Sequence, residues 1–264
     1  MDIMNPTEAQ KLIASKKWYH RFEILPGVTT PGSVPLDPKV TFAHMELPQR
    51  LDGKKVLDVG TLDGPIAFEC EARGASVTAL DIQDPDATAF STAKQILGSS
   101  VRYIQGSVYD ASKLLADEYF DYIFFLGVYY HLKYPLLAFE ELSLRLVHGG
   151  RLVFEGECWQ VYAETIDGRA VKDVNVQKQL REIARMSELP VTLFYPGTFK
   201  NDDSNWFIPN ATCLRAWLES AGMQVITMKL YAPPGDSLIQ RVGGVAQKIA
   251  GLRVEHRLIP KGCF

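Results

Sequence analysis

Between residues 54 and 157 the chain alternates short apolar runs with segments in which apolar residues recur at helical spacing. The runs that predict strands are residues 54–59, 75–81, 101–106, 119–127 and 151–157, and the segments that predict helices are residues 65–74, 86–97 and 135–147. Strands that alternate with helices are typical of an α/β fold. The pattern therefore predicts a mostly parallel sheet with helices on both faces.

The flanking segments have other patterns. Asn5 and Pro6 predict the start of a helix that runs to about Lys17, and a Pro- and Gly-rich arm with four ring residues follows it. Residues 157–205 have weak periodicity and predict an insertion. Residues 210–222 predict a helix, residues 223–231 a strand, and residues 237–251 a strand at a sheet edge. We expect one domain over residues 1–264, with an amino-terminal helix and arm (1–50), a cofactor-binding core (51–156), an insertion or lid (157–205) and a carboxy-terminal part (206–264).

Composition narrows the class of protein. The chain has 264 residues, 47% of them hydrophobic, and a net charge of -3, which gives no general attraction to nucleic acid or to an anionic membrane. No apolar run reaches the ~18 residues that span a bilayer, and the first ten residues lack the pattern of a signal peptide. We expect a cytoplasmic protein with no metal site whose cysteines are free thiols, namely Cys70, Cys158, Cys213 and Cys263.

The segment "DVGTLDG" after the first strand of the core predicts a ligand-binding turn. Gly60 and Gly64 allow a sharp turn close to a ligand, and Asp81 ends the next strand about 20 residues on, where a carboxylate binds ribose hydroxyls. The turn also contains Asp58 and Asp63, which would repel a pyrophosphate. They suit the ammonium and sulfonium centres of S-adenosylmethionine. A nicotinamide oxidoreductase is therefore disfavoured, and a turn without any ligand is the plainer alternative.

These residues resemble the class I S-adenosylmethionine-dependent methyltransferases from Lys54 to about Leu230. That family's first motif is an acid-x-Gly-x-Gly-x-Gly turn, in which Leu62 here replaces the middle glycine. The resemblance implies a Rossmann-like, seven-stranded sheet whose last strand is antiparallel, with S-adenosylmethionine as cofactor. The residues that we expect at the cofactor are Asp58, Gly60, Thr61, Asp63, Gly64, Asp81, Ile82, Ser107, Val108 and Gly127.

A second segment, "FFLGVYYHLKYP", resembles a narrower group. It is similar to the "G-V-L-Y-H-x-x-x-P" segment of the wobble-uridine tRNA methyltransferases that transfer a carboxymethyl group, and of their uncharacterised bacterial relatives. The arm "WYHRFEILPGVTTPG" and the segment "SNWFIPNATCLRAWLESAGM" are similar to segments of the same group. Because the chain is shorter than the tRNA enzymes and lacks a long basic amino-terminal region, we assign it to the small-molecule relatives. Modification of tRNA stays the alternative.

The carboxylated cofactor of the tRNA enzymes would need a cationic partner for its extra carboxylate. Lys39 and Arg241 are the candidates, although both are expected at the surface. We therefore expect ordinary S-adenosylmethionine. A non-catalytic binding module and a homodimer are left open.

Methyl transfer is an in-line displacement, so the protein must mainly align the acceptor atom, the methyl group and the sulfur. His131 is the first candidate for a general base, and Tyr130 and Glu155 are further catalytic candidates. Packing against the adenosine is the alternative for His131. The residues that we expect to contact a small-molecule acceptor are Tyr19, His20, Glu157, Trp206 and Asn210.

Overall fold

The computed structural model describes residues 4–159, 182, 188–196, 202–231 and 239–249. Its central element is a seven-stranded sheet in the order β12-β13-β9-β8-β5-β6-β7. These strands are β5 (Lys55–Val59), β6 (Ser76–Asp81), β7 (Arg102–Gln105), β8 (Phe120–Leu126), β9 (Leu146–Trp159), β12 (Met223–Tyr231) and β13 (Ile239–Lys248). The helices are α1 (Pro6–Ala14), α2 (Pro38–His44), α3 (Pro65–Ala72), α4 (Phe90–Leu97), α5 (Ala111–Leu114), α6 (Pro135–Arg145) and α9 (Ala211–Ser220).

The topology confirms the expected fold. Strands β5 to β9 pair in parallel, whereas β13 is antiparallel to both of its neighbours, β9 and β12. Val59 is in register with Leu80 of β6 and Phe125 of β8, so these three strands end at the same edge of the sheet. The turns that follow them therefore meet at that edge, where ligands bind in open α/β sheets.

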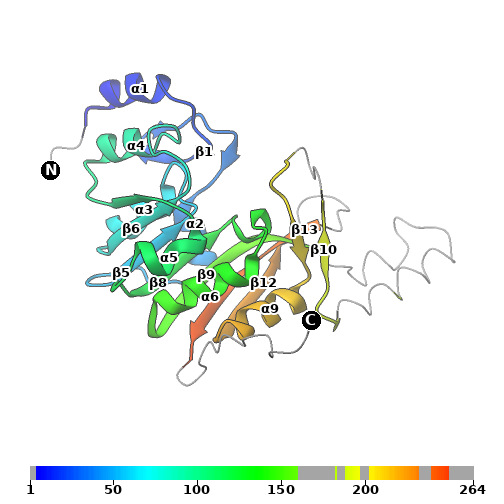
Figure 1. Ribbon diagram of the computed structural model, residues 1–264. Helices are drawn as coiled ribbons and strands as arrows, with labels where there is room; N and C mark the ends of the chain where they lie inside the picture. Colours follow the sequence, from blue (N-terminus) through cyan, green and yellow to red (C-terminus); the bar gives the residue numbers. More distant parts are fainter. Residues whose placement is uncertain (1–3, 160–181, 183–187, 197–201, 232–238, 250–264) are drawn as a thin grey trace, which may run out of the picture.

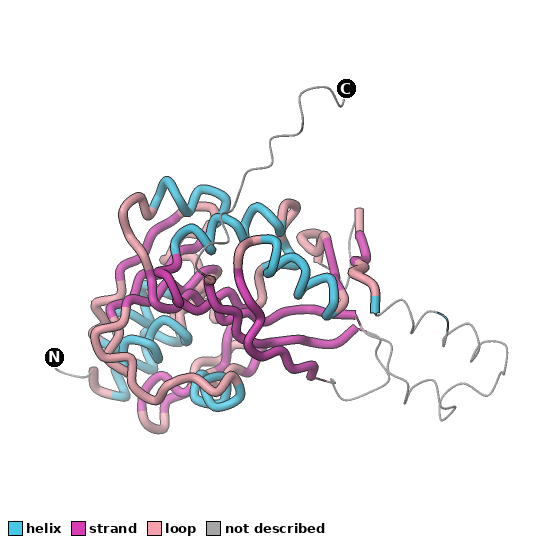
Figure 2. The backbone as a smooth tube through the Cα atoms, turned by 90° about the horizontal axis from the view of Figure 1, so that it is seen from below, coloured by secondary structure: helices cyan, strands magenta, loops and turns pink. Residues whose placement is uncertain are grey.

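Alternation along the strands divides the core into two layers, which lie on either side of the sheet in Figures 1 and 2. Val56 and Phe124 face the layer that contains α1 to α4 and the arm, and Leu57 and Phe125 face the layer that contains α5, α6 and α9. All four side chains are fully buried. Because both faces of the sheet are covered, the sequences of β5 and β8 are nearly continuous apolar runs.

Three local predictions need correction. The strand expected at the sheet edge, β13, lies between β12 and β9, and β12 is the edge strand. Gly244 of β13 allows close packing, since a Cβ on this residue would lie 2.0 Å from the carbonyl oxygen of Thr227 on β12. Helix α4 begins at Phe90, after a turn in which the backbone N–H groups of Ala87 and Thr88 donate to Asp84. Helix α1 begins at its Asn5 cap as expected but ends at Ala14.

The arm folds against the sheet as short strand pairs. Strands β1 (His20–Arg21) and β4 (Val34–Pro35) pair in parallel, and β2 (Glu23–Leu25) pairs with β3 (Val28–Thr29). Trp18 and Phe22 are buried in the same apolar layer as α3 and α4. The ring residues of the arm thus attach it to the domain beside the cofactor turn.

The segment expected as an insertion lies mostly outside the described residues. Its described part includes the end of β9 and the strand β10 (Thr192–Phe194), which pairs with β11 (Phe207–Pro209). Within the described part of the chain, no helix is both long and apolar enough to span a bilayer.

Candidate functional site

The turn between β5 and α3 has the backbone geometry of a ligand-binding loop. Gly60 and Gly64 have φ of 74° and 89°, and Leu62 between them has φ of 48°. Leu62 therefore adopts the left-handed conformation that a glycine would adopt more easily, at a cost of about 1–2 kcal/mol. The replacement of the family's middle glycine changes the side chain at this position and leaves the left-handed turn in place.

Asp58 lies behind the turn and supports it. Its carboxylate is buried and accepts a hydrogen bond from the Thr61 hydroxyl, with 2.7 Å between Oγ1 and Oδ2. Burial raises the pKa of Asp58 to about 6, although the hydrogen bond from Thr61 works in the opposite direction. Asp58 and Thr61 thus stabilise each other beneath the expected cofactor.

Asp63 has a role that its sequence position did not indicate. Its fully buried carboxylate accepts hydrogen bonds from the backbone N–H groups of Tyr19 and His20 and pairs with Nδ1 of the His20 imidazole. The charge of Asp63 is therefore directed at the arm. The expectation that Asp63 faces a cationic centre of the cofactor does not fit these contacts, because all of them come from the arm.

Asp81 is placed to bind a diol. The backbone N–H of Leu62 donates to Oδ2 and that of Gln83 donates to Oδ1, both at 2.9 Å. Each carboxylate oxygen accepts two hydrogen bonds, so both can still accept one from a ribose hydroxyl. Ile82, the next residue, is 70% exposed and offers an apolar surface for an adenine ring beside that ribose.

Ser107 and Val108, which follow β7, are the two residues that were expected to lie near the adenine. The Ser107 hydroxyl accepts a hydrogen bond from the Tyr109 N–H and caps the short 3-10 helix η1 (Val108–Asp110). Val108 is buried. The Ser107 oxygen is thus already used locally, and its contact with the cofactor stays a prediction.

The segment after β8 lies against the cofactor turn. Gly127 has φ of 73°, and the 3-10 helix η2 (Tyr129–His131) follows it. A Cβ on Gly60 would lie 2.4 Å from Cγ2 of Val128, so the glycine is required for this contact. Tyr130 is nearly buried, and its ring lies 4.2 Å from the imidazole of His131, measured between centroids.

His131 also contacts a segment distant in sequence. Its Nδ1 lies 2.8 Å from the Ser204 hydroxyl and 3.7 Å from Oδ2 of Asp202. Burial lowers the pKa of His131, and the negative charge of Asp202 opposes that effect. Ser204 is the first residue of the segment "SNWFIPNATCLRAWLESAGM" but was assigned no role there, and Asp202 lies outside every motif that the sequence analysis singled out.

Glu155 does not fit the expected role of a general base. Arg241 on β13 binds its carboxylate through two nitrogens, Nε to Oε1 and a terminal nitrogen to Oε2, the latter at 2.6 Å. Burial by itself lowers the pKa of Arg241, and the hydrogen bonds with Glu155 outweigh this and raise it. Both oxygens of the Glu155 carboxylate are thus engaged by Arg241. The opposite end of the guanidinium lies 3.5 Å from Glu157.

The expected acceptor residues divide into two sets. Trp206 is half-buried, stacks on Phe194 at 6.3 Å and donates its backbone N–H to the Tyr130 carbonyl. Tyr19 is half-exposed beside the cofactor turn. Both positions are compatible with ligand contact.

The side chains of Asn210 and His20 form hydrogen bonds that join segments of the protein. Asn210 is fully buried, caps α9 by accepting from the Cys213 N–H, and donates to the Leu189 carbonyl. Its expected contact with an acceptor is therefore corrected, because no surface remains for one. His20 directs its Nδ1 at Asp63 and thereby joins the arm to the turn.

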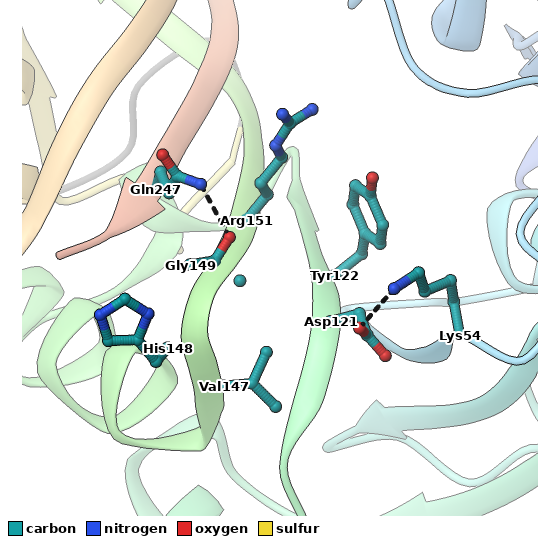
Figure 3. Close-up of a pocket in the computed structure, with 9 residues that line it drawn as sticks. Lys54, Asp121, Tyr122, Val147, His148, Gly149, Arg151 and Gln247 are labelled. Atoms are coloured by element: carbon teal, nitrogen blue, oxygen red, sulfur yellow. Dashed lines mark hydrogen bonds and ion pairs between the residues drawn. The ribbon is translucent and has the colours of Figure 1, made fainter. Parts of the chain in front are cut away.

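A polar hollow of about 290 Å³ lies at the opposite edge of the sheet and is distinct from this site (Figure 3). It contains the ion pair of Lys54 with Asp121, at 3.0 Å, and a hydrogen bond from Gln247 to the Gly149 carbonyl. Strands β5 and β8 begin there, whereas the cofactor turn follows the end of β5. In the residues that the structure describes, no group of three or more His, Cys, Asp or Glu side chains could hold a metal ion.

The residues at the carboxyl edge fit S-adenosylmethionine. The left-handed turn brings the backbone close to the ligand, Asp81 keeps acceptor positions for a ribose, and Ile82 exposes an apolar surface. No cationic side chain of the kind that a pyrophosphate would require takes part in these contacts.

Comparison with known proteins agrees with this geometry. A family profile described as "Methyltransferase domain" matches residues 57–154. The tRNA U34 carboxymethyltransferase of Actinobacillus pleuropneumoniae serotype 3 (strain JL03) is 29% identical over 178 residues, which are 66% of this chain and 46% of that protein. The corresponding protein of Colwellia psychrerythraea (strain 34H / ATCC BAA-681) is 29% identical over 65% of this chain and 45% of its own length. The chain thus spans a little under half the length of these relatives.

Solved structures share the fold at low sequence identity. The amino-terminal domain of EvdMO1, crystallised with S-adenosylhomocysteine and D-fucose, has a TM-score of 0.64 and 15% identity over 94% of this chain and 98% of that one. A protein from Listeria monocytogenes described as a S-adenosylmethionine-dependent methyltransferase has a TM-score of 0.55 and 15% identity over 80% and 99%. The family match over residues 57–154, the shared fold and the geometry of the cofactor turn together support a class I S-adenosylmethionine-dependent methyltransferase.

Proposed function

We propose that the protein transfers a methyl group from S-adenosylmethionine to an oxygen or nitrogen atom of a small-molecule acceptor. The observation that carries this proposal is the contact between Gly60 in the cofactor turn and Val128 in the segment that leads to His131. Through this contact the cofactor turn adjoins a group that can accept a proton. The bound cofactor supplies the activated methyl group, and the protein aligns and desolvates the acceptor.

The side chains around His131 favour a small acceptor with a planar or apolar part. Tyr130, Trp206 and Phe194 contribute aromatic surface, and Phe194 is half-exposed. An aromatic wall with a few polar groups is typical of small-molecule sites.

The charges near His131 support the same choice. Glu155, Glu157 and Asp202 are acidic, and Arg241 is bound to two of these three carboxylates. Lys133 lies with its Nζ 5.1 Å from the ring centre of Trp206. Polyanion binding depends on many unpaired basic side chains, so this balance disfavours an RNA backbone.

The second candidate is tRNA modification with a carboxylated cofactor, which the names of the sequence relatives favour. Arg241 is the cation near Tyr130 that an extra carboxylate would need, with its guanidinium carbon 5.7 Å from the Tyr130 ring centre. Lys39 is exposed on α2. Because Glu155 already holds Arg241 through two nitrogens, the geometry favours the ordinary cofactor.

Calorimetry with S-adenosylhomocysteine tests the cofactor part of the proposal. Binding is expected in the intact protein, and Asp81→Asn is expected to weaken it at least about tenfold, or ~1.4 kcal/mol, through loss of the ribose contact. Asp121→Asn, at the opposite edge of the sheet, is the matched control and should leave the affinity unchanged. No detectable binding to the unaltered protein would remove the proposal.

Two further measurements separate the acceptor classes. Methyl transfer from labelled S-adenosylmethionine to small hydroxylated or amino aromatic compounds is expected, and bulk tRNA should not be retained in a gel-shift assay. Retention of tRNA, together with tighter binding of the carboxylated cofactor than of the ordinary one, would instead establish the second candidate.

A further inference from the structure

We propose that Ser204 and Asp202 are positioning residues that hold the imidazole proton of His131 on Nδ1, so that Nε2 is the atom that takes a proton from the acceptor. The inference rests on the proposed function for its role in catalysis. The arrangement of protons stands on geometry alone and can be measured without any substrate.

The hydrogen bonds determine which nitrogen carries the proton. The Ser204 hydroxyl lies 2.5 Å from Oδ1 of Asp202 and 2.8 Å from Nδ1 of His131. A hydroxyl has a single proton, and an ionised carboxylate can only accept. The Ser204 hydroxyl must therefore donate to Asp202, which leaves its oxygen to accept from an N–H on Nδ1 of His131.

The other ring nitrogen is then free to act as a base. In neutral imidazole a proton on Nδ1 leaves a lone pair on Nε2. Among the residues that the structure describes, the hydrogen bonds of the His131 ring all involve Nδ1. The imidazole is 30% exposed, so the ring is within reach of a bound acceptor.

The backbone fixes both ends of this chain of hydrogen bonds. The Trp206 N–H donates to the Tyr130 carbonyl at 2.8 Å, which attaches the segment containing Ser204 to η2. The Ser204 N–H also donates to Oδ1 of Asp202 at 2.8 Å, so the carboxylate is oriented by the turn that it belongs to. The segment that contains Asp202 and Ser204 is thus held against the short helix η2, which carries His131.

The surrounding charges suit a base that is neutral at rest. Burial is the largest influence on the pKa of His131 and lowers it. Arg241 on β13 lowers the pKa of His131 further. Asp202 raises this pKa, and so does Glu157, which lies on β9. The imidazole stays neutral at neutral pH, and Asp202, 3.7 Å away, stabilises the positive charge that proton uptake creates.

The proposed step balances as follows. The acceptor O–H or N–H bond breaks, its proton moves to Nε2 of His131, and its electron pair forms the new bond to the methyl carbon. The carbon–sulfur bond of the cofactor breaks and its electron pair stays on sulfur, which cancels the sulfonium charge. The substrate class is therefore an acceptor whose reacting atom carries a proton.

Nuclear magnetic resonance of protein with ¹⁵N-labelled histidine tests the proton position, with the His131 signals assigned from a His131→Asn variant. In the unaltered protein, the proton is expected on Nδ1, and Ser204→Ala should shift the population toward the form protonated on Nε2. Ser220→Ala is the matched control, because the Ser220 hydroxyl only donates to the Trp217 carbonyl. A proton on Nε2 in the unaltered protein, or an unchanged spectrum in Ser204→Ala, would overturn the proposal.

The pH profile of kcat/KM tests the catalytic consequence. Asp202→Asn removes a charge that raises the pKa of His131, so the acid limb should move to lower pH by about 0.5–1 unit. An unmoved limb would contradict the assignment of Nε2 as base. If the proton position is as expected but no methyl transfer occurs, the proposed function fails and the tautomer assignment survives.

Discussion

Two regions of the site differ in how the chain builds them. The cofactor half, residues 55–82, is one strand-turn-helix-strand unit, and hydrogen bonds inside the unit, from Thr61 to Asp58 and from Leu62 to Asp81, shape its turn. The acceptor half takes His131, Ser204 and Arg241 from segments that are far apart in sequence. A binding site inside one supersecondary unit can be recognised from a motif, whereas one assembled by tertiary pairing cannot.

His131→Ala is expected to have the largest effect. It should impair the acceptor half of the site and leave cofactor binding by the other half unchanged. Loss of a general base typically lowers the rate by about 10²–10⁴-fold, while the affinity for S-adenosylhomocysteine should not change. Single-turnover rates and calorimetry on the same preparation measure the two quantities. If cofactor affinity falls together with the rate, the two halves act as one unit and the distinction is wrong.

Asp58→Asn should affect the stability of the cofactor half in a pH-dependent way. The pKa of Asp58 is raised from 3.8 to about 6 in the folded protein, so the unfolded state ionises first as the pH rises. The unaltered protein therefore loses stability between about pH 4 and pH 6, by on the order of 3 kcal/mol. The asparagine variant does not titrate there and can still accept from Thr61.

Urea unfolding at several pH values between 4 and 7 checks this expectation. The stability difference between Asp58→Asn and the unaltered protein should move in favour of the variant as the pH rises. Asp121→Asn serves as the control, because the pKa of Asp121 is lowered by its bonds with Lys55 and Lys54 against the opposing effect of burial. A pH-independent difference for Asp58→Asn would show that its carboxylate is hydrated in the folded state.

Leu62→Gly is expected to have the smallest effect. A glycine relieves the left-handed backbone strain by about 1–2 kcal/mol but gives the unfolded chain more freedom, at a cost of about 0.5–1 kcal/mol. The melting temperature and cofactor affinity should therefore change little. Leu62→Val, which is β-branched, should lower both, and equal behaviour of the two variants would mean that the turn tolerates any residue.

The sequence predicted the sheet, its helices and the glycine turn because their signals are local. Apolar runs, the Asn5 cap and the position of Asp81 after a strand each depend on a few adjacent residues. The pairing of Asp63 with His20 joins residues 43 apart, and that of Arg241 with Glu155 joins residues 86 apart. Such contacts follow from strand register and the path of the arm, which the local pattern does not encode.

The interior position of β13 also has a consequence for the order of folding. Strand β12 pairs with β13 and has no other partner in the sheet, so it cannot join until residues 239–248 have been synthesised. Domains begin to fold while the chain emerges from the ribosome, and β5 to β8 can pair earlier. The cofactor turn can therefore form on a nascent chain before Arg241, the partner of Glu155, has been synthesised. A ribosome stalled before residue 239 should carry a chain whose β9 edge is still open, which is the stage most exposed to aggregation.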